Sequence, residues 1–179
     1  MRRLSRRFFC LTAALLGLAA AGAMASVDQG DKAPAWSAHD FAGHAVDFPA
    51  VTQGKPTIVI FWATWCPYCK AFMPYLKSIA ADYAQQGVKV VAIDVKEDGR
   101  VDPKAYVQAL GFSPIAIASV DGDRIMQAYG IRYIPGLFII DGQGQVAYKR
   151  PWTDLPAGQT VAELWAHDVR AALDAVVRK

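Results

Sequence analysis

Two cysteines three positions apart, Cys66 and Cys69, follow a continuous apolar run at residues 57–62. The run predicts a central strand buried on both faces, and apolar spacing after it predicts a helix over about 66–86. The first thiol of such a strand-to-helix junction lies at the helix N-terminus, where free backbone N–H groups and the helix dipole stabilise a thiolate. Cys69 follows one turn later, within reach of Cys66 for a disulfide. This spacing predicts a redox-active pair.

Three other roles for Cys66 and Cys69 fit the sequence less well. A structural disulfide between them would close a very small loop and constrain the unfolded chain little. Zinc needs about four ligands, and no second cysteine or histidine pair has suitable spacing. A c-type haem would need His after the second cysteine, where Lys70 stands. The three histidines of the chain are scattered and are expected on the surface or in loops: His39, His44 and His167.

The first 25 residues have the pattern of a secretory signal. A basic start precedes an apolar run from Phe8 to about Ala21 and the small-residue sequence Ala23-Met24-Ala25. The apolar run is too short for a stable membrane span, so we expect cleavage before Ser26. Residues 26–179 then form one domain, without an internal repeat. The basic residues of the start are Arg2, Arg3, Arg6 and Arg7.

Removing this signal changes both the charge and the cysteine count. The formal net charge falls from +3 to −1, because four arginines and no acidic residue are lost. The mature chain therefore offers no electrostatic basis for binding nucleic acid. Cys10 is also lost, which leaves two cysteines in an exported protein. The segment around Arg6-Arg7 resembles a twin-arginine export motif, and an ordinary Sec signal fits equally well.

The rest of the chain alternates strands and helices. The first predicted element is a hairpin. Pro74 is expected to kink the long helix after Cys66. A capping box at Thr160 and Glu163 starts the last helix, which runs toward Val177. The hairpin covers 36–41 and 44–48, the later strands cover 88–95, 113–119, 137–140 and 145–150, and the later helices cover 102–110 and 121–129. Strand 57–62, its helix and strand 88–95 form a βαβ unit with a parallel strand pair.

The segment from Phe61 to Lys70, followed by Met73-Pro74, resembles the active-site segment of the TlpA/ResA/DsbE-like exported thioredoxins. The leading hairpin and Tyr133-Ile134-Pro135-Gly136 before Leu137 also match that group. The resemblance covers nearly the whole mature chain. It implies an α/β thioredoxin fold, with a central mixed β-sheet flanked by helices and an N-terminal β-hairpin.

The resemblance also implies roles for individual residues. Cys66 would be the exposed nucleophile and Cys69 the resolving thiol. Pro135 would be a cis-proline facing the disulfide, and the backbone of Ile134 would pair with an extended substrate segment. The expected substrate-binding residues are Trp65, Pro67, Tyr68, Ile134 and Pro135.

Two positions depart from the family pattern. Thioredoxin-like proteins often carry a buried carboxylate six residues before the first cysteine, where this chain has Ile60. ResA-like and cytochrome-maturation members tend to carry Glu three residues after the second cysteine, where this chain has Phe72. Such a carboxylate would accept the proton of Cys69 as it attacks the mixed disulfide. The sequence does not identify a group that replaces the missing carboxylate. The departure weakens the case for a role in cytochrome c maturation.

The sequence leads us to expect a periplasmic thiol–disulfide oxidoreductase that reduces disulfides of exported, cysteine-containing proteins through Cys66 and Cys69. The resemblance implies a membrane thiol donor of the DsbD/CcdA kind, and we expect a monomer without cofactor or metal. The dipeptide Pro67-Tyr68 leaves the redox direction open, because it occurs in proteins that work in different directions. The alternatives are a dithiol oxidase or isomerase, or a copper-binding or chaperone module that uses the two thiols.

Overall fold

The computed structural model describes residues 26–153, 158 and 160–178. The predicted signal, its cleavage site and part of the loop at 151–159 lie outside the described residues. Within them, no helix is both long and apolar enough to cross a membrane.

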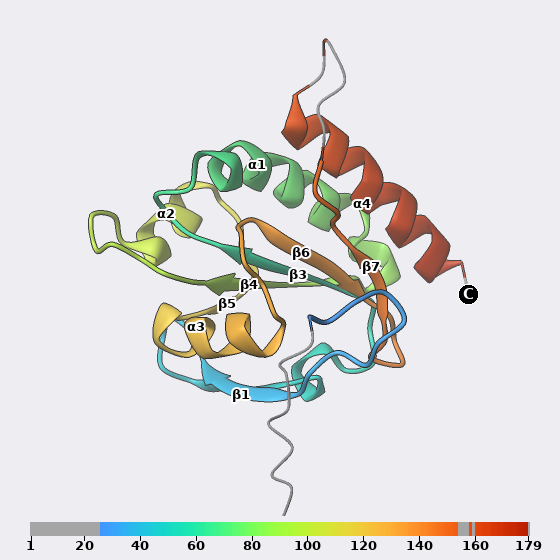
Figure 1. The fold of residues 1–179 in the computed structure, drawn as a ribbon, viewed down its shortest axis with the longest axis horizontal. Coiled ribbons are helices and arrows are strands. Elements are labelled where there is room, and N and C mark those ends of the chain that lie inside the picture. The colour runs from blue at the N-terminus through green and yellow to red at the C-terminus, as the bar shows by residue number, and fades with distance from the viewer. Residues whose placement is uncertain (1–25, 154–157, 159, 179) are drawn as a thin grey trace, which may run out of the picture.

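A five-stranded mixed sheet forms the centre of the molecule, in the order β5-β4-β3-β6-β7 (Figure 1). The middle strand β3 is parallel to β4 and antiparallel to β6, and all six of its residues are buried. That burial explains why the strand is apolar throughout. The strands are β3 (Thr57–Trp62), β4 (Lys89–Asp94), β5 (Ile115–Ile117), β6 (Gly136–Ile140) and β7 (Val146–Lys149).

Helices cover both faces of the sheet (Figure 1). Helices α1 (Pro67–Asp82), α2 (Pro103–Ala109) and α4 (Val161–Val177) contribute to one apolar cluster. Helix α3 (Ser119–Ala128) and the antiparallel hairpin of β1 (Trp36–His39) and β2 (Ala45–Phe48) contribute to the other. Short 3-10 turns lie at Ala50–Thr52 and Ala84–Gln86. This arrangement is the flanked mixed sheet with an N-terminal hairpin that the resemblance implied.

Alternate residues of β3 divide between the two clusters. Ile58, Ile60 and Trp62 face the cluster that contains α1 and α4, whereas Val59 and Phe61 face the cluster that contains the hairpin. This is the period of two expected for a strand. The strand therefore anchors the whole core, and the active-site segment begins where it ends.

The predicted elements are confirmed, with shifted boundaries. The helix expected over 66–86 ends earlier, at Asp82, and the 3-10 turn follows it. Pro74 lies inside α1, and the helix continues beyond it. The capping box of the last helix is present, because Thr160 and Glu163 bond each other's backbone N–H groups.

Candidate active site

Three segments far apart in the sequence meet at one end of the sheet. Because β3 and β4 are parallel, Trp62 and Asp94 are partners at their carboxyl ends. Because β3 and β6 are antiparallel, Phe61 lies beside Gly136 at the start of β6. The segment of Cys66, the loop after β4 and the loop before β6 are therefore neighbours. Carboxyl ends of strands are where open α/β sheets place their sites.

Cys66 caps the N-terminus of α1. The backbone N–H of Cys69 donates to the Cys66 Sγ at 3.2 Å, and Pro67 occupies the first turn. The two cysteines form a disulfide with their Cα atoms 5.3 Å apart. When the bond is reduced, the same N–H and the helix dipole are placed to stabilise a Cys66 thiolate.

The loop before β6 lies directly against this disulfide. The Ile134–Pro135 peptide bond is cis, as the resemblance implied. The Ile134 carbonyl oxygen lies 3.9 Å from the Cys66 Sγ. Cys66 itself is only 2% exposed, whereas the resemblance implied an exposed residue. In the disulfide its sulfur is bonded to Cys69 and covered on one side by this loop.

Exposed aromatic side chains lie on the segments that flank the disulfide and the cis-proline. Trp65 and Tyr68 were expected there, and the Trp65 indole N–H donates to the Lys96 carbonyl at 2.7 Å. Sequence reasoning missed Tyr133 and Trp152, which are also exposed and meet edge-to-face with ring centroids 5.6 Å apart. Sequence proximity to Pro135 could have indicated Tyr133, but nothing in the sequence pointed to Trp152.

Arg150 is a second residue that the sequence did not indicate. It is buried, and its Nε and Nη2 donate to the Pro135 carbonyl at 3.0 and 2.6 Å. Its guanidinium also lies over the rings of Trp165 and Tyr133, 4.5 and 5.1 Å from their centroids. Burial lowers the pKa of this guanidinium, and the carbonyl and the two rings offset the cost of burying its charge. Arg150 thus holds the cis-proline loop in place.

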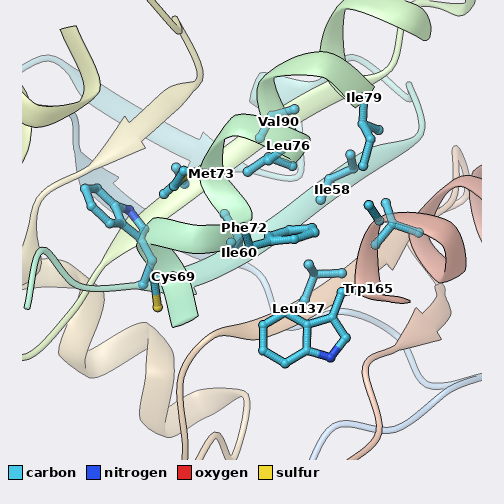
Figure 2. Packing of buried hydrophobic residues seen from close by; sticks show 14 of the residues in the cluster. Ile58, Ile60, Cys69, Phe72, Met73, Leu76, Ile79, Val90, Leu137 and Trp165 are labelled. Atoms are coloured by element: carbon cyan, nitrogen blue, oxygen red, sulfur yellow. The ribbon is translucent and has the colours of Figure 1, made fainter. Parts of the chain in front are cut away.

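The two positions that lack the family carboxylates are filled by packing. Ile60 and Phe72 are fully buried, and Phe72 meets Trp165 of α4 edge-to-face at 6.0 Å. Figure 2 shows both among the buried side chains of the cluster that includes Cys69. The apolar packing between α1, β3 and α4 thus occupies the places of those carboxylates.

Carboxylates instead approach the site from the loop after β4. The Glu97 carboxylate accepts hydrogen bonds from the backbone N–H and the hydroxyl of Thr64, each at 2.5 Å. Thr64 is buried and stands two residues before Cys66. Asp94, at the end of β4, is 1% exposed. Burial raises the pKa of Asp94 to about 9, and hydrogen bonding and repulsion from Glu97 add to the rise. Sequence reasoning missed both residues, because Glu97 contacts a residue 33 positions away and the burial of Asp94 results from tertiary packing.

Among the described residues, no three His, Cys, Asp or Glu side chains gather at a spacing that would hold a metal ion.

The profile of the AhpC/TSA family matches residues 29–149. The chain belongs to this family.

Individual relatives agree with the resemblance drawn from the sequence. The chain is 36% identical to a thiol:disulfide interchange protein DsbE of Tatumella citrea over 68% of this chain and 60% of the relative. It is 32% identical to the thiol-disulfide oxidoreductase ResA of Bacillus thuringiensis over 65% of this chain and 66% of the relative. The matched part of the chain thus spans about 60–66% of these relatives' lengths.

The fold has counterparts among solved structures. A thiol:disulfide interchange protein of the thioredoxin family from Chlorobium tepidum superimposes with a TM-score of 0.60 at 28% identity. The superposition covers 83% of this chain and 99% of the other. The thioredoxin fold is therefore confirmed.

Proposed function

We propose that this protein is an exported thiol–disulfide oxidoreductase that reduces disulfides of cysteine-containing exported proteins. The Cys66 thiolate attacks one sulfur of the substrate disulfide, which releases one substrate thiolate and leaves a mixed disulfide. Cys69 then loses its proton and attacks the Cys66 Sγ, which releases the second substrate thiolate. Two electrons pass to the substrate, and the Cys66–Cys69 disulfide remains on the protein.

One observation carries this proposal. The Cys66–Cys69 disulfide lies at the N-terminus of α1, and the cis Ile134–Pro135 peptide lies against it. The helix N-terminus favours the thiolate form of Cys66. The loop offers backbone groups to an extended segment that carries the substrate disulfide. The names of the relatives from Tatumella citrea and Bacillus thuringiensis support the same class of reaction.

The substrate would bind across the cis-proline loop and the exposed rings beside it. Backbone groups of Ile134 would pair with an extended substrate segment, and Pro135 would keep that segment in register with Cys66. Trp65, Pro67 and Tyr68 would contact it from the other side. Tyr133 and Trp152 extend this surface, because their exposed rings pack together next to the loop.

Turnover as a reductase requires electrons, because an extracytoplasmic compartment is oxidising. We propose that a membrane thiol donor of the DsbD/CcdA kind reduces the Cys66–Cys69 disulfide, and that the protein works as a monomer in the periplasm after cleavage before Ser26. The basic and apolar pattern of residues 1–25 supports this location.

Insulin reduction tests the reaction. With dithiothreitol as electron donor, residues 26–179 should accelerate the precipitation of insulin chains, and Cys66→Ser should abolish the acceleration. Cys69→Ser provides a matched comparison, because it retains Cys66 and should form a mixed disulfide without turning over. Equal rates for the wild type and Cys66→Ser would overturn the proposal and favour a binding role for the two thiols.

A further inference from the structure

The loop after β4 is attached to the segment that carries the nucleophile. Glu97 accepts both hydrogen bonds that Thr64 donates through its backbone N–H and its hydroxyl. The Trp65 indole, one residue after Thr64, donates to the carbonyl of Lys96, one residue before Glu97. Thr64 and Cys66 are two residues apart, so their Cα atoms lie within about 7 Å of each other. A change at Glu97 therefore acts on a residue that stands two positions before Cys66.

Asp94 and Glu97 are two carboxyl groups three residues apart, one at the end of β4 and the other in the loop that follows it. Burial raises the pKa of Asp94 most, and hydrogen bonding with Glu97 and repulsion from its charge raise it further, whereas Ser119 lowers it. The Asp94 Oδ1 is buried and has no donor among the described residues. Two ionised carboxylates can only accept hydrogen bonds, so a bond between them needs one proton. The buried Asp94, with its raised pKa, is the member that holds this proton at neutral pH.

The groups that act on Asp94 and Glu97 include a further carboxylate and no ion-paired cation among the described residues. Asp123 of α3 acts on Asp94 and accepts the Lys96 backbone N–H at 2.8 Å. Ser119 is neutral, and on the other side Tyr106 of α2 packs against Trp62, the β3 partner of Asp94. No lysine or arginine among the described residues forms an ion pair with Asp94, Glu97 or Asp123.

We propose that Asp94 and Glu97 are a proton-sharing positioning pair that holds the Thr64–Trp65 segment and makes the Cys66–Cys69 dithiol more reducing. The proposal rests on the proposed thiol–disulfide function, and it names a source of negative charge where Ile60 and Phe72 replace the family carboxylates. A negative charge near Cys66 disfavours its thiolate. The less the thiolate of the reduced form is stabilised, the more reducing the couple becomes.

The test is the thiol–disulfide equilibrium constant of residues 26–179 against dithiothreitol, measured across pH in the wild type, Glu97→Gln and Asp94→Asn. The pH dependence of Cys66 alkylation by iodoacetamide gives the pKa of its thiol in the same proteins. Asp98→Asn is the matched control, because Asp98 lies in the same loop, is exposed, and pairs with Arg100 instead of Thr64.

Glu97→Gln keeps an oxygen that can accept from Thr64 but removes the charge. It should shift the equilibrium toward the dithiol by about three- to tenfold and lower the pKa of the Cys66 thiol. Asp94→Asn keeps a neutral donor to Glu97, so it should match the wild type at neutral pH. Above about pH 9 the wild-type pair loses its proton, so the wild type should become more reducing than Asp94→Asn. Asp98→Asn should follow the wild type throughout.

The proposal would be overturned if Glu97→Gln had the same thiol–disulfide equilibrium constant and the same alkylation profile as the wild type. It would also be overturned if Asp98→Asn shifted the equilibrium constant as much as Glu97→Gln. If Asp94→Asn does not fold, Glu97→Gln decides alone. These measurements need no protein substrate. If the wild type forms no Cys66–Cys69 disulfide with oxidised dithiothreitol, the proposed function fails; if it does and the variants behave alike, only the role of the pair fails.

Discussion

Asp94 is a buried carboxyl group whose protonation should affect stability as well as redox chemistry. Burial, with Glu97 beside it, raises its pKa in the folded protein to about 9, whereas the value in an unfolded chain is about 3.9. The folded state thus binds this proton more tightly. Its stabilising contribution is complete below about pH 4 and is lost progressively as the pH rises toward about 9.

Asp94→Asn removes this dependence, because an amide does not titrate in this range. We therefore expect the melting temperature of the variant, relative to the wild type, to rise steadily between about pH 4 and about pH 9. Thermal unfolding followed by circular dichroism measures the difference, and Asp98→Asn should show no such trend. A constant offset across that range would contradict the assignment of the proton to Asp94.

Arg150 acts on the cis-proline loop through geometry that lysine does not reproduce. Its Nε and Nη2 donate to the same Pro135 carbonyl, and its flat guanidinium lies over Trp165 and Tyr133. Arg150→Lys should lower kcat/KM for a protein disulfide about tenfold, which corresponds to about 1.4 kcal/mol in transition-state free energy.

The reaction of reduced Cys66 with a small aromatic disulfide should change far less in Arg150→Lys, because a small molecule does not need the loop. Stopped-flow kinetics with both substrates measures the contrast. Arg132→Lys is the control, since Arg132 is exposed in the same loop. Equal losses with the large and the small substrate would show that Arg150 does not act through the loop.

At the scale of elements, α1 is held to the rest of the molecule by its apolar face. Phe72 is fully buried between Trp165 and the sheet. Phe72→Ala should lower the free energy of unfolding by about 3–5 kcal/mol, because it removes buried surface and leaves a cavity. Urea unfolding of the oxidised protein measures the loss.

Val120→Ala serves as the reference for that measurement, because Val120 is 83% exposed on α3 and its truncation should cost less than about 0.5 kcal/mol. A loss below about 1.5 kcal/mol in Phe72→Ala would mean that α1 and α4 close over the vacated space.

The elements that the sequence predicts well are those whose signal is local. The strand at 57–62 is apolar at every position because both of its faces are covered, and the capping box of Thr160 and Glu163 lies within four residues. The shift at the end of α1 has a local cause as well, because Tyr83 leaves the helical conformation and a 3-10 turn follows.

The candidate site is predicted only in part, because its supporting contacts are not local. Cys66 and Cys69 carry their chemistry in their spacing, and the family resemblance adds Pro135. By contrast, Glu97 reaches Thr64 across 33 residues, and in the sequence it is one acidic residue of a charged loop. Arg150 reaches Pro135 across 15 residues and follows a lysine, so it is indistinguishable in sequence from an exposed basic residue.

At the scale of the whole molecule, the order of the strands explains how the site is assembled. The parallel pairing of β4 with β3 delivers Asp94 and Glu97, and the antiparallel pairing of β6 delivers the cis-proline loop. Helix α3 also contacts the end of β4, because Gly122 packs so closely on the Asp94 carbonyl that a Cβ atom there would overlap it. The pairing of β3 with β4 and β6 therefore brings the segments of the site to the same end of the sheet.

Capture of a mixed disulfide tests the central claim most directly. Cys69→Ala, expressed in cells as the full chain, should retain partner proteins bound covalently through Cys66. Mass spectrometry should find cysteine-containing exported proteins and a membrane thiol donor. The double variant Cys66→Ser/Cys69→Ala should retain none. Recovery of a quinone-linked oxidase as the main partner would reverse the proposed direction of electron flow. Equal recovery from both variants would contradict the assignment of Cys66 as the nucleophile.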